Sequence, residues 1–222
     1  MPATPQPLPT PQLWQAQFTP SLRWIGPALN LCTRQQPGIA LSIDERPAQA
    51  LTPAQADFIL RWGAPDTLKG YAVEIATDEL VVIVHPDNPL DSLDLSEITA
   101  VFTAKTKSWS AFIKGNSGRI QVWTEADGTD VQQVFQSNLL QQPLTNPFAH
   151  LAPDPMAMRQ SVGADLNAIG YLPRRWLDST VRAVQINGIS AASLRQPILV
   201  MRETGPQGAQ KDWLLCLQES IK

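Results

Sequence analysis

The sequence contains few of the residues that most often build metal centres or histidine-based catalytic sites. Its 222 residues include only two cysteines, Cys32 and Cys216, and two histidines, His85 and His150. No CxxC pair occurs, so zinc-ligand spacing is absent. Neither histidine has the acidic and nucleophilic partners that a catalytic triad requires. We therefore expect no metal, no cofactor and no catalytic residues.

Charged residues and long hydrophobic runs are also scarce. Charged residues make up 17% of the chain and the net charge is −3, which argues against binding to nucleic acid or to an anionic membrane surface. No apolar run approaches the roughly 18–20 residues that a bilayer-spanning helix needs. No GxSxG, Walker or GxGxxG motif occurs. These absences disfavour a nucleic-acid-binding protein, a membrane-spanning protein and the enzyme classes that those motifs mark.

Two interpretations of the cysteines remain open. We prefer two buried thiols that act as small hydrophobic side chains, because free cysteine is among the most buried residue types. The alternative is a disulfide that ties the first helix to the last, which an oxidising compartment permits.

Proline, in contrast, is abundant, with 20 residues, and many of them lie at the N-terminus. Residues 1–12 read MPATPQPLPTPQ, which predicts a Pro/Thr-rich tether. Such tethers commonly follow the lipidated cysteine of bacterial surface lipoproteins. We expect Met1 to stand in place of a removed signal peptide and lipid anchor, and an ordinary disordered tail is the alternative.

The remaining residues alternate between short apolar runs and amphipathic segments. Strands are expected at 13–19, 39–43, 56–63, 71–76, 80–84, 119–124, 167–173, 181–186 and 198–201. Helices are expected at about 21–32, from Thr52 onward, and at 94–102, 130–139, 156–162 and 210–221. This alternation predicts a mostly parallel sheet with right-handed crossovers.

The stretch from residue 78 to residue 112 organises the chain. Leu80–Val84 is a β-branched run typical of a strand buried on both faces. Two prolines within 85–89 end that strand, and residues 94–97 have the spacing of a capping box that opens a helix. The residues alone predict a strand that leaves one α/β unit and a helix that starts another.

This order resembles the crossover between the lobes of type II periplasmic solute-binding proteins, and of the phosphate-binding proteins of ABC importers in particular. Their pattern VNPDNP…LTLEQLRDIF.GKI.NW is similar to residues 84–89, 95–102 and 106–109. Residues 167–173 resemble the strand NPGAIGYV of the same proteins. The resemblance implies a two-lobed α/β fold of mixed, mostly parallel sheets flanked by helices, with a ligand cleft between the lobes.

The resemblance also implies a division of the chain. Residues 1–12 would form the tether, 13–84 with 190–222 lobe one, and 85–189 lobe two. Two segments would cross between the lobes, near His85 and near Gly188, as a hinged binding protein requires. The strand at 198–201 should then lie in the same sheet as Leu80–Val84 or pack directly on it.

Three loops are expected to face the cleft, because ligands of α/β folds bind at strand ends and helix N-termini. The first follows the strand at 13–19, the second follows 39–43, and the third follows 119–124. The expected ligand-binding residues are Thr19, Ser21, Leu22, Arg46, Thr124, Asp127, Gly128 and Thr129. Helix capping is the alternative role for Ser21, and a solvated surface charge is the preferred interpretation of Arg46.

The third loop departs from the phosphate-binding pattern R-E-x-G-S-G-T. Aligned on Gly128 and Thr129, with the first glycine of the pattern missing, the chain has Thr124 where the arginine would be. Arginine holds phosphate through two parallel hydrogen bonds. Glu125, Asp127 and Asp130 add negative charge there, although they would also complement a helix dipole. We expect phosphate to bind weakly or not at all.

The resemblance implies an extracytoplasmic solute-binding protein of an ABC-type, phosphate-importer-like system, located in the periplasm or at the cell surface. It would bind a small-molecule or oxyanion solute without catalysis and deliver it to a membrane ABC permease. It would be a monomer that contacts the membrane only through a lipid anchor. One alternative is a sensing or scaffolding lipoprotein with a degraded pocket, and another is the effector domain of a transcription regulator.

Overall fold

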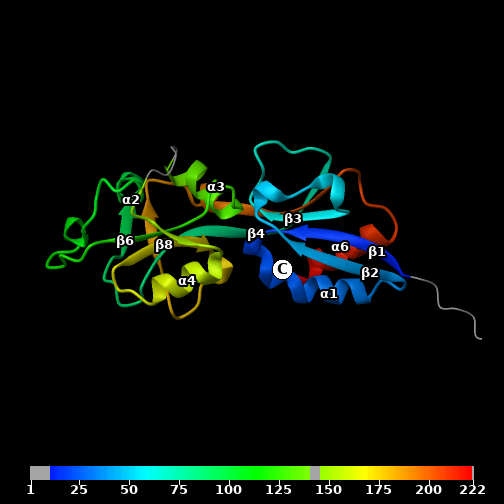
Figure 1. Cartoon of the computed structure of the whole chain (residues 1–222), viewed down its shortest axis with the longest axis horizontal. Helices are drawn as coiled ribbons and strands as arrows, with labels where there is room; N and C mark the ends of the chain where they lie inside the picture. The colour runs from blue at the N-terminus through cyan, green and yellow to red at the C-terminus, as the bar shows by residue number, and fades with distance from the viewer. Residues whose placement is uncertain (1–10, 141–145, 222) are drawn as a thin grey trace, which may run out of the picture.

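A curled, mixed ten-stranded sheet runs the length of the molecule and is flanked by helices (Figure 1). The structure, a computed structural model, describes residues 11–140 and 146–221. The strand order is β2-β1-β3-β10-β4-β8-β6-β7, with β9 paired to β4 and β5 paired to β9. The predicted α/β class with mixed sheets and flanking helices is confirmed.

The elements follow the predicted alternation closely. The strands are β1 (Gln12–Phe18), β2 (Ile39–Glu45), β3 (Phe58–Trp62), β4 (Tyr71–Val84), β5 (Ser92–Asp94), β6 (Gln121–Glu125), β7 (His150–Ala152), β8 (Ala168–Pro173), β9 (Arg182–Asn187) and β10 (Arg195–Arg202). The α-helices are α1 (Gly26–Arg34), α2 (Leu95–Phe102), α3 (Asp130–Phe135), α4 (Pro155–Gly163), α5 (Ala191–Leu194) and α6 (Ala209–Ser220). Short helical turns are η1 (Pro20–Ile25), η2 (Ala48–Ala50), η3 (Pro53–Gln55), η4 (Trp109–Ala111), η5 (Gln136–Leu140) and η6 (Arg174–Trp176).

Strand β4 joins the two halves of the molecule. Its first part, 71–79, pairs antiparallel with β10, and its last part, Leu80–Val84, pairs antiparallel with β8 and β9. The predicted placement of 198–201 in the same sheet as Leu80–Val84 is therefore confirmed. The prediction of two separate strands at 71–76 and 80–84 was wrong, because residues 77–79 include neither glycine nor proline and stay extended.

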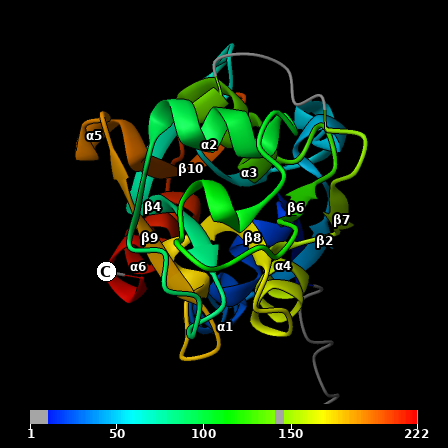
Figure 2. The ribbon, with the colours of Figure 1, turned by 90° about the vertical axis from the view of Figure 1, so that its left-hand side faces the viewer.

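The lobes can be defined from this pairing. We propose that they divide within β4, near Asp78, rather than after Val84 as the sequence suggested. Lobe one would then contain β1, β2, β3, β10, α1, α6 and the first part of β4. Lobe two would contain the last part of β4 with β5 to β9 and α2 to α4. In the end-on view of Figure 2, β4, β8 and β9 lie between α2 and α3 on one side and α4 on the other.

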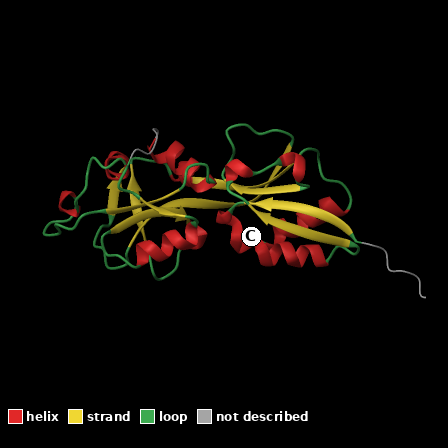
Figure 3. Ribbon diagram, in the orientation of Figure 1, coloured by secondary structure: helices red, strands yellow, loops and turns green. Residues whose placement is uncertain are grey.

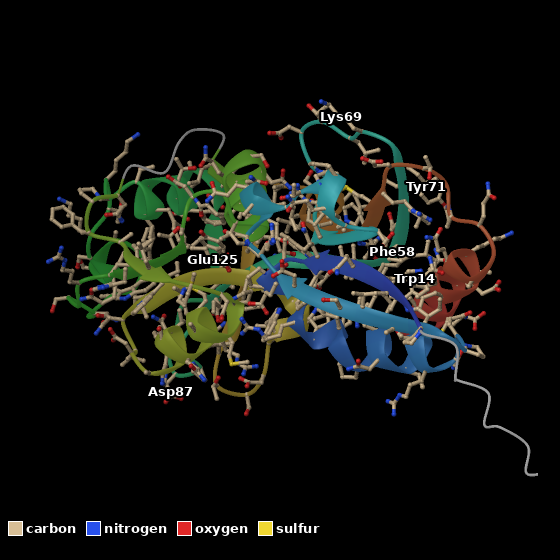
Figure 4. All side chains as sticks on the ribbon, turned by 45° about the vertical axis from the view of Figure 1, so that its right-hand side comes forward. Trp14, Phe58, Lys69, Tyr71, Asp87 and Glu125 are labelled. Carbon is tan, nitrogen blue, oxygen red and sulfur yellow. A yellow bond between two sulfur atoms is a disulfide. The ribbon has the colours of Figure 1, made fainter. Side chains whose placement is uncertain are left out.

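Helices α1 and α6 pack on one face of the lobe-one sheet. Phe58 of β3 contacts Trp213 of α6 with ring centroids 4.5 Å apart, and it contacts Trp14 of β1 at 5.5 Å (Figure 4). Because side chains alternate across a strand, Leu60 and Trp62 share this face with Phe58. The neighbouring residues of β3 must then face the other side of the sheet.

A disulfide links α1 to α6. Cys32 and Cys216 are bonded, with their Cα atoms 5.7 Å apart, which lies within the normal range for a disulfide. The preferred interpretation as two free thiols was wrong, because the two helices pack side by side on the same face of the sheet.

Two predictions at the start of the chain also need correction. Most of the expected tether, residues 1–10, lies outside the described residues. Gln12 belongs to β1, because its N–H donates to the carbonyl of Gly38 (2.7 Å) and it pairs with Ile39. The helix expected from Thr52 onward is only the short turn η3, since β3 begins at Phe58.

Within 11–140 and 146–221, no helix has the length and hydrophobicity that a membrane span requires.

Candidate functional site

Two of the three loops assigned to the cleft contact residues of the opposite lobe. Ser21, in η1 after β1, donates a hydrogen bond from its hydroxyl to Asp130 Oδ2 at the start of α3 (2.6 Å). The N–H of Gln49, in η2, donates to the carbonyl of Gly128 (3.0 Å). Gly128 has a φ of +87°, which favours glycine, and a Cβ there would collide with the Gln49 side chain. These contacts place the first and third loops on either side of one interlobe surface.

The Asp130 carboxylate lies at the centre of this surface. Asp130 is 1% exposed, and besides Ser21 it accepts hydrogen bonds from the N–H of Trp62 (3.2 Å) and from its neighbour Val131 (2.9 Å). The Thr19 and Ser21 hydroxyls are 2.9 Å apart. Burial raises the pKa of Asp130, and the hydroxyl hydrogen bonds act against that rise. A hydroxyl and backbone amides are the donors that bind oxyanions, and here they bind the chain's own carboxylate.

A second buried carboxyl group, Glu125, lies at the end of β6. Glu125 is 3% exposed, and its Oε1 atom has no hydrogen-bond partner among the described residues. Burial, and secondly the nearby Asp130, raises the pKa of Glu125 to about 8, and Asp154 adds to the effect. Glu125 is therefore largely protonated at neutral pH. Figure 4 shows it near the middle of the molecule, where the lobes meet.

Thr124 is held inside lobe two by a buried polar cluster. Its hydroxyl contacts the Tyr171 hydroxyl (2.7 Å) and donates to Gln132 Oε1 (3.1 Å). The Tyr171 hydroxyl also donates to Gln132 and accepts from the N–H of Glu125 (3.0 Å). Burial raises the pKa of Tyr171. Gln132 Nε2 is buried without a hydrogen-bond partner in the described part of the chain.

The other expected residues differ in how free they are to bind a ligand. The Leu22 amide donates to the Thr19 carbonyl (2.9 Å) and its side chain is fully buried, which counts against a ligand role. Arg46 pairs with Asp44 (2.6 Å) on a half-exposed surface, in agreement with the surface-charge interpretation. Asp127 is exposed.

Thr129 caps α3. Its hydroxyl accepts a hydrogen bond from the N–H of Gln132 (3.3 Å) and donates to the Ala126 carbonyl (3.2 Å). This is the N-cap role that a threonine before a helix commonly has. The loop therefore presents Asp130 rather than Thr129 to the opposite lobe.

The sequence did not identify Arg61, Gln132 or Tyr171 as part of this region. Each is less than 6% exposed, and Arg61 donates to Gln133 Oε1 of lobe two (3.1 Å). A signal was present for Arg61, because a charged residue within the apolar run FILRW is unusual for a buried strand. In residues 11–140 and 146–221, no group of three or more His, Cys, Asp or Glu side chains could hold a metal ion.

A family model described as a PBP superfamily domain matches residues 66–211, which is more than half of the chain. The chain belongs to this family. The matched residues include strands β4 to β10 and all of lobe two.

The relatives of this PBP superfamily member include phosphate-binding proteins. It is 26% identical to the phosphate-binding protein PstS of Pseudomonas aeruginosa over 129 residues, covering 53% of this chain and 40% of that protein. The match thus spans less than half of the curated relative. A substrate-binding protein assigned to phosphate ABC transport in Clostridium perfringens, solved with bound phosphate, has a TM-score of 0.77 at 20% identity, covering 93% of both chains. An ABC-type phosphate transport receptor from Vibrio cholerae has a TM-score of 0.72 at 18% identity, covering 94% of both.

The comparisons confirm the resemblance and the fold drawn from residues 84–109 and 167–173. At these identities the solved structures establish the fold alone. The relatives named above are described as phosphate-binding or phosphate-transport proteins. These names do not favour a sensing or scaffolding lipoprotein.

Proposed function

We propose that this chain is an extracytoplasmic solute-binding protein of an ABC-type, phosphate-importer-like transport system. It binds a small solute between its lobes, performs no catalysis, acts as a monomer and delivers the solute to a membrane permease. The observation that carries this proposal is the buried hydrogen bond from Ser21 to Asp130, which joins polar loops of two lobes at the surface where α/β proteins bind ligands.

Binding would proceed by movement of the lobes about β4 and the chain near residue 190. Such an opening would break polar contacts between the lobes, and also the packing of Trp24 against the lobe-two cluster. The polar ones include Ser21 with Asp130, Gln49 with Gly128, and the ion pair of Arg23 with Asp154 (3.0 Å). Trp62 with Asp130, Arg61 with Gln133 and Trp176 with the Ser21 carbonyl are further polar contacts between the lobes. Polar contacts between lobes exchange readily for contacts with water or a solute, which suits a hinged protein.

The unpaired atoms of the interlobe region indicate the class of solute. Glu125 Oε1 and Gln132 Nε2 are buried without partners among the described residues, and such atoms cost roughly 1–3 kcal/mol each. A solute with a donor for Glu125 and an acceptor for Gln132 would satisfy both. A neutral or zwitterionic solute has these groups.

Bare phosphate is a poor candidate for the same site. The donors suited to an oxyanion already bind Asp130, and Thr124 stands where the related loop has an arginine. A second anion beside a buried carboxylate is strongly disfavoured unless a cation or proton accompanies it. We expect phosphate to bind in the millimolar range or more weakly.

The proposed location outside the cytoplasm is supported by the Cys32–Cys216 disulfide, since disulfides persist in oxidising compartments. A lipid anchor on the N-terminal side of β1 would keep the protein at the membrane surface, close to its permease.

A thermal-shift screen of the ligand-stripped protein tests the proposal. The panel contains zwitterionic amino acids, neutral sugars, sulfate, molybdate and phosphate. A solute at 100 times its Kd should add about 2.7 kcal/mol of stability. Ser21→Ala should remove the shift, whereas the exposed control Ser117→Ala should keep it. A Tm that responds to none of these solutes, or a shift that survives Ser21→Ala, would count against an interlobe binding site.

A further inference from the structure

Lobe one has a cavity on the face of its sheet opposite α1 and α6. The cavity has a volume of about 420 Å³, which lies within the usual range of small-molecule sites. Figure 3 shows the long helices of this lobe on one side of the sheet, and only short helical turns and loops on the other. The cavity lies over β3 and β10 and does not include Ser21 or Asp130, although its lining residue Arg61 also contacts Gln133 of lobe two.

The pairing of β3 with β10 determines what lines the cavity. Ile59 pairs with Met201, and Arg61 pairs with Leu199, so these four side chains share one face of the sheet. Leu51 also lines the cavity. The floor is thus apolar except for one guanidinium group.

Arg61 lacks a carboxylate partner at this floor. Arg61 is 5% exposed, and its Nη2 atom donates to Gln133 Oε1 (3.1 Å). Its Nε atom has no hydrogen-bond partner, and the side chain forms no ion pair within residues 11–140 and 146–221. Burial lowers the pKa of Arg61, while the more distant Asp130 and Asp66 act against that effect. A buried guanidinium without a direct anion is unfavourable, and a bound anion would compensate it.

A second cation lies at the rim of the cavity. Lys69 is exposed on the loop between β3 and β4 (Figure 4) and also lines the cavity. That loop ends at Gly70, whose φ is +77° and where a Cβ would lie 2.5 Å from the Arg202 carbonyl, so the loop packs directly on β10. The Arg202 guanidinium points away, over Phe58 (5.2 Å), and Glu203 is the one acidic lining residue.

We propose that this cavity binds a small amphiphilic carboxylate. The carboxylate would contact Arg61 and Lys69, and the hydrocarbon body would cover Leu51, Ile59 and Met201. The planar guanidinium matches a carboxylate, and the apolar floor provides hydrophobic contact that a small inorganic anion would not use. This site goes beyond the interlobe function and takes a ligand of a different class.

Calorimetric titration of the full chain with three probes tests the proposal. Octanoate has both groups, acetate has only the anionic head, and octan-1-ol has only the hydrocarbon body. We expect octanoate to bind at least 10-fold more tightly than either of the others. Equal affinities for octanoate and octan-1-ol would overturn the proposal, because the cations would then have no role.

Variants locate the site. Arg61→Gln should abolish octanoate binding and Lys69→Gln should weaken it several-fold, whereas the exposed Lys114→Gln, which removes the same charge outside the cavity, should leave it unchanged. If Arg61→Gln loses its cooperative thermal transition, Lys69→Gln decides, since Lys69 is exposed. Octanoate affinity that is unchanged in Lys69→Gln, or reduced equally by Lys114→Gln, would contradict the site.

Discussion

At the scale of single residues, two buried carboxyl groups distinguish the interlobe region. Asp130 has its hydrogen bonds satisfied by donors from both lobes, whereas Glu125 has an unpaired oxygen. The first therefore acts as a contact between the lobes. Glu125 is held in its protonated form, and its unpaired oxygen can accept a hydrogen bond from a solute.

Replacing Glu125 should change how stability depends on pH. The folded-state pKa of about 8 lies above the ordinary value of 4.5, so between these pH values the folded chain holds a proton that the unfolded chain has lost. Its contribution is fully present below about pH 4.5 and is lost as the pH rises towards 8. Burial raises the pKa of Asp78 and Asp130 as well, so they act in the same direction.

The expected result for Glu125→Gln is a smaller loss of unfolding free energy between pH 5.5 and pH 8.5. The difference from the unmodified chain should be on the order of 3 kcal/mol, since glutamine does not titrate. Urea denaturation at the two pH values measures it. Asp127→Asn changes an exposed carboxylate in the same loop and should leave the pH dependence as it is. Identical slopes in Glu125→Gln and the unmodified chain would show that Glu125 is not held protonated.

The sequence predicted part of this region. Glu125, Asp127 and Asp130 follow a strand and precede a helix, so an acidic loop at the cleft could be predicted from local pattern. Which acid contacts the other lobe could not, because Ser21 lies 109 residues away and that contact depends on the docking of the lobes. The sequence indicated that Arg46 is a surface charge, but it could not predict the ion pair with Asp44, which depends on side-chain conformation.

At the scale of elements, local sequence patterns located most helices and strands correctly, but they did not predict where every strand ends. Apolar runs and the capping-box spacing correctly placed β8 and α2, because both signals are local. The continuity of β4 was missed because residues 77–79 are polar. Their pairing with β10 keeps them extended. Polar residues within a strand are tolerated where neighbouring strands supply the hydrogen bonds.

The disulfide between α1 and α6 should contribute strongly to stability. Cys32 and Cys216 are separated by 184 residues. Closing so long a loop lowers the conformational entropy of the unfolded chain and should raise the free energy of unfolding by roughly 3–5 kcal/mol. For a chain of this length, reduction should lower the Tm by roughly 6–20 °C. Differential scanning calorimetry with and without a phosphine reductant measures the change. The Cys32→Ser/Cys216→Ser double variant is the control and should not respond to reductant, and an unchanged Tm in the unmodified chain would contradict a formed bond.

At the scale of the whole molecule, the fold was predictable and the ligand was not. Short stretches at 84–109 and 167–173 were enough to indicate a two-lobed binding protein, because they resemble motifs of that family. Ligand identity depends on a few side chains at the interlobe surface, and a shared fold does not determine it. In this chain the Ser21 hydroxyl and the Trp62 N–H donate to Asp130, so these donors are not free to bind an oxyanion.

Calorimetric titration of phosphate into the ligand-stripped protein at pH 6, where Glu125 is protonated, tests this arrangement most directly. We expect a Kd in the millimolar range or weaker, equivalent to about −4 kcal/mol. Asp130→Gly should free the Ser21 hydroxyl and the Trp62 amide and tighten phosphate binding at least 10-fold. A micromolar Kd for the unmodified chain, or no gain in a folded Asp130→Gly, would contradict the proposed role of Asp130. In the first case Arg46→Ala would show whether Arg46 supplies the missing cation, since only then would the affinity collapse.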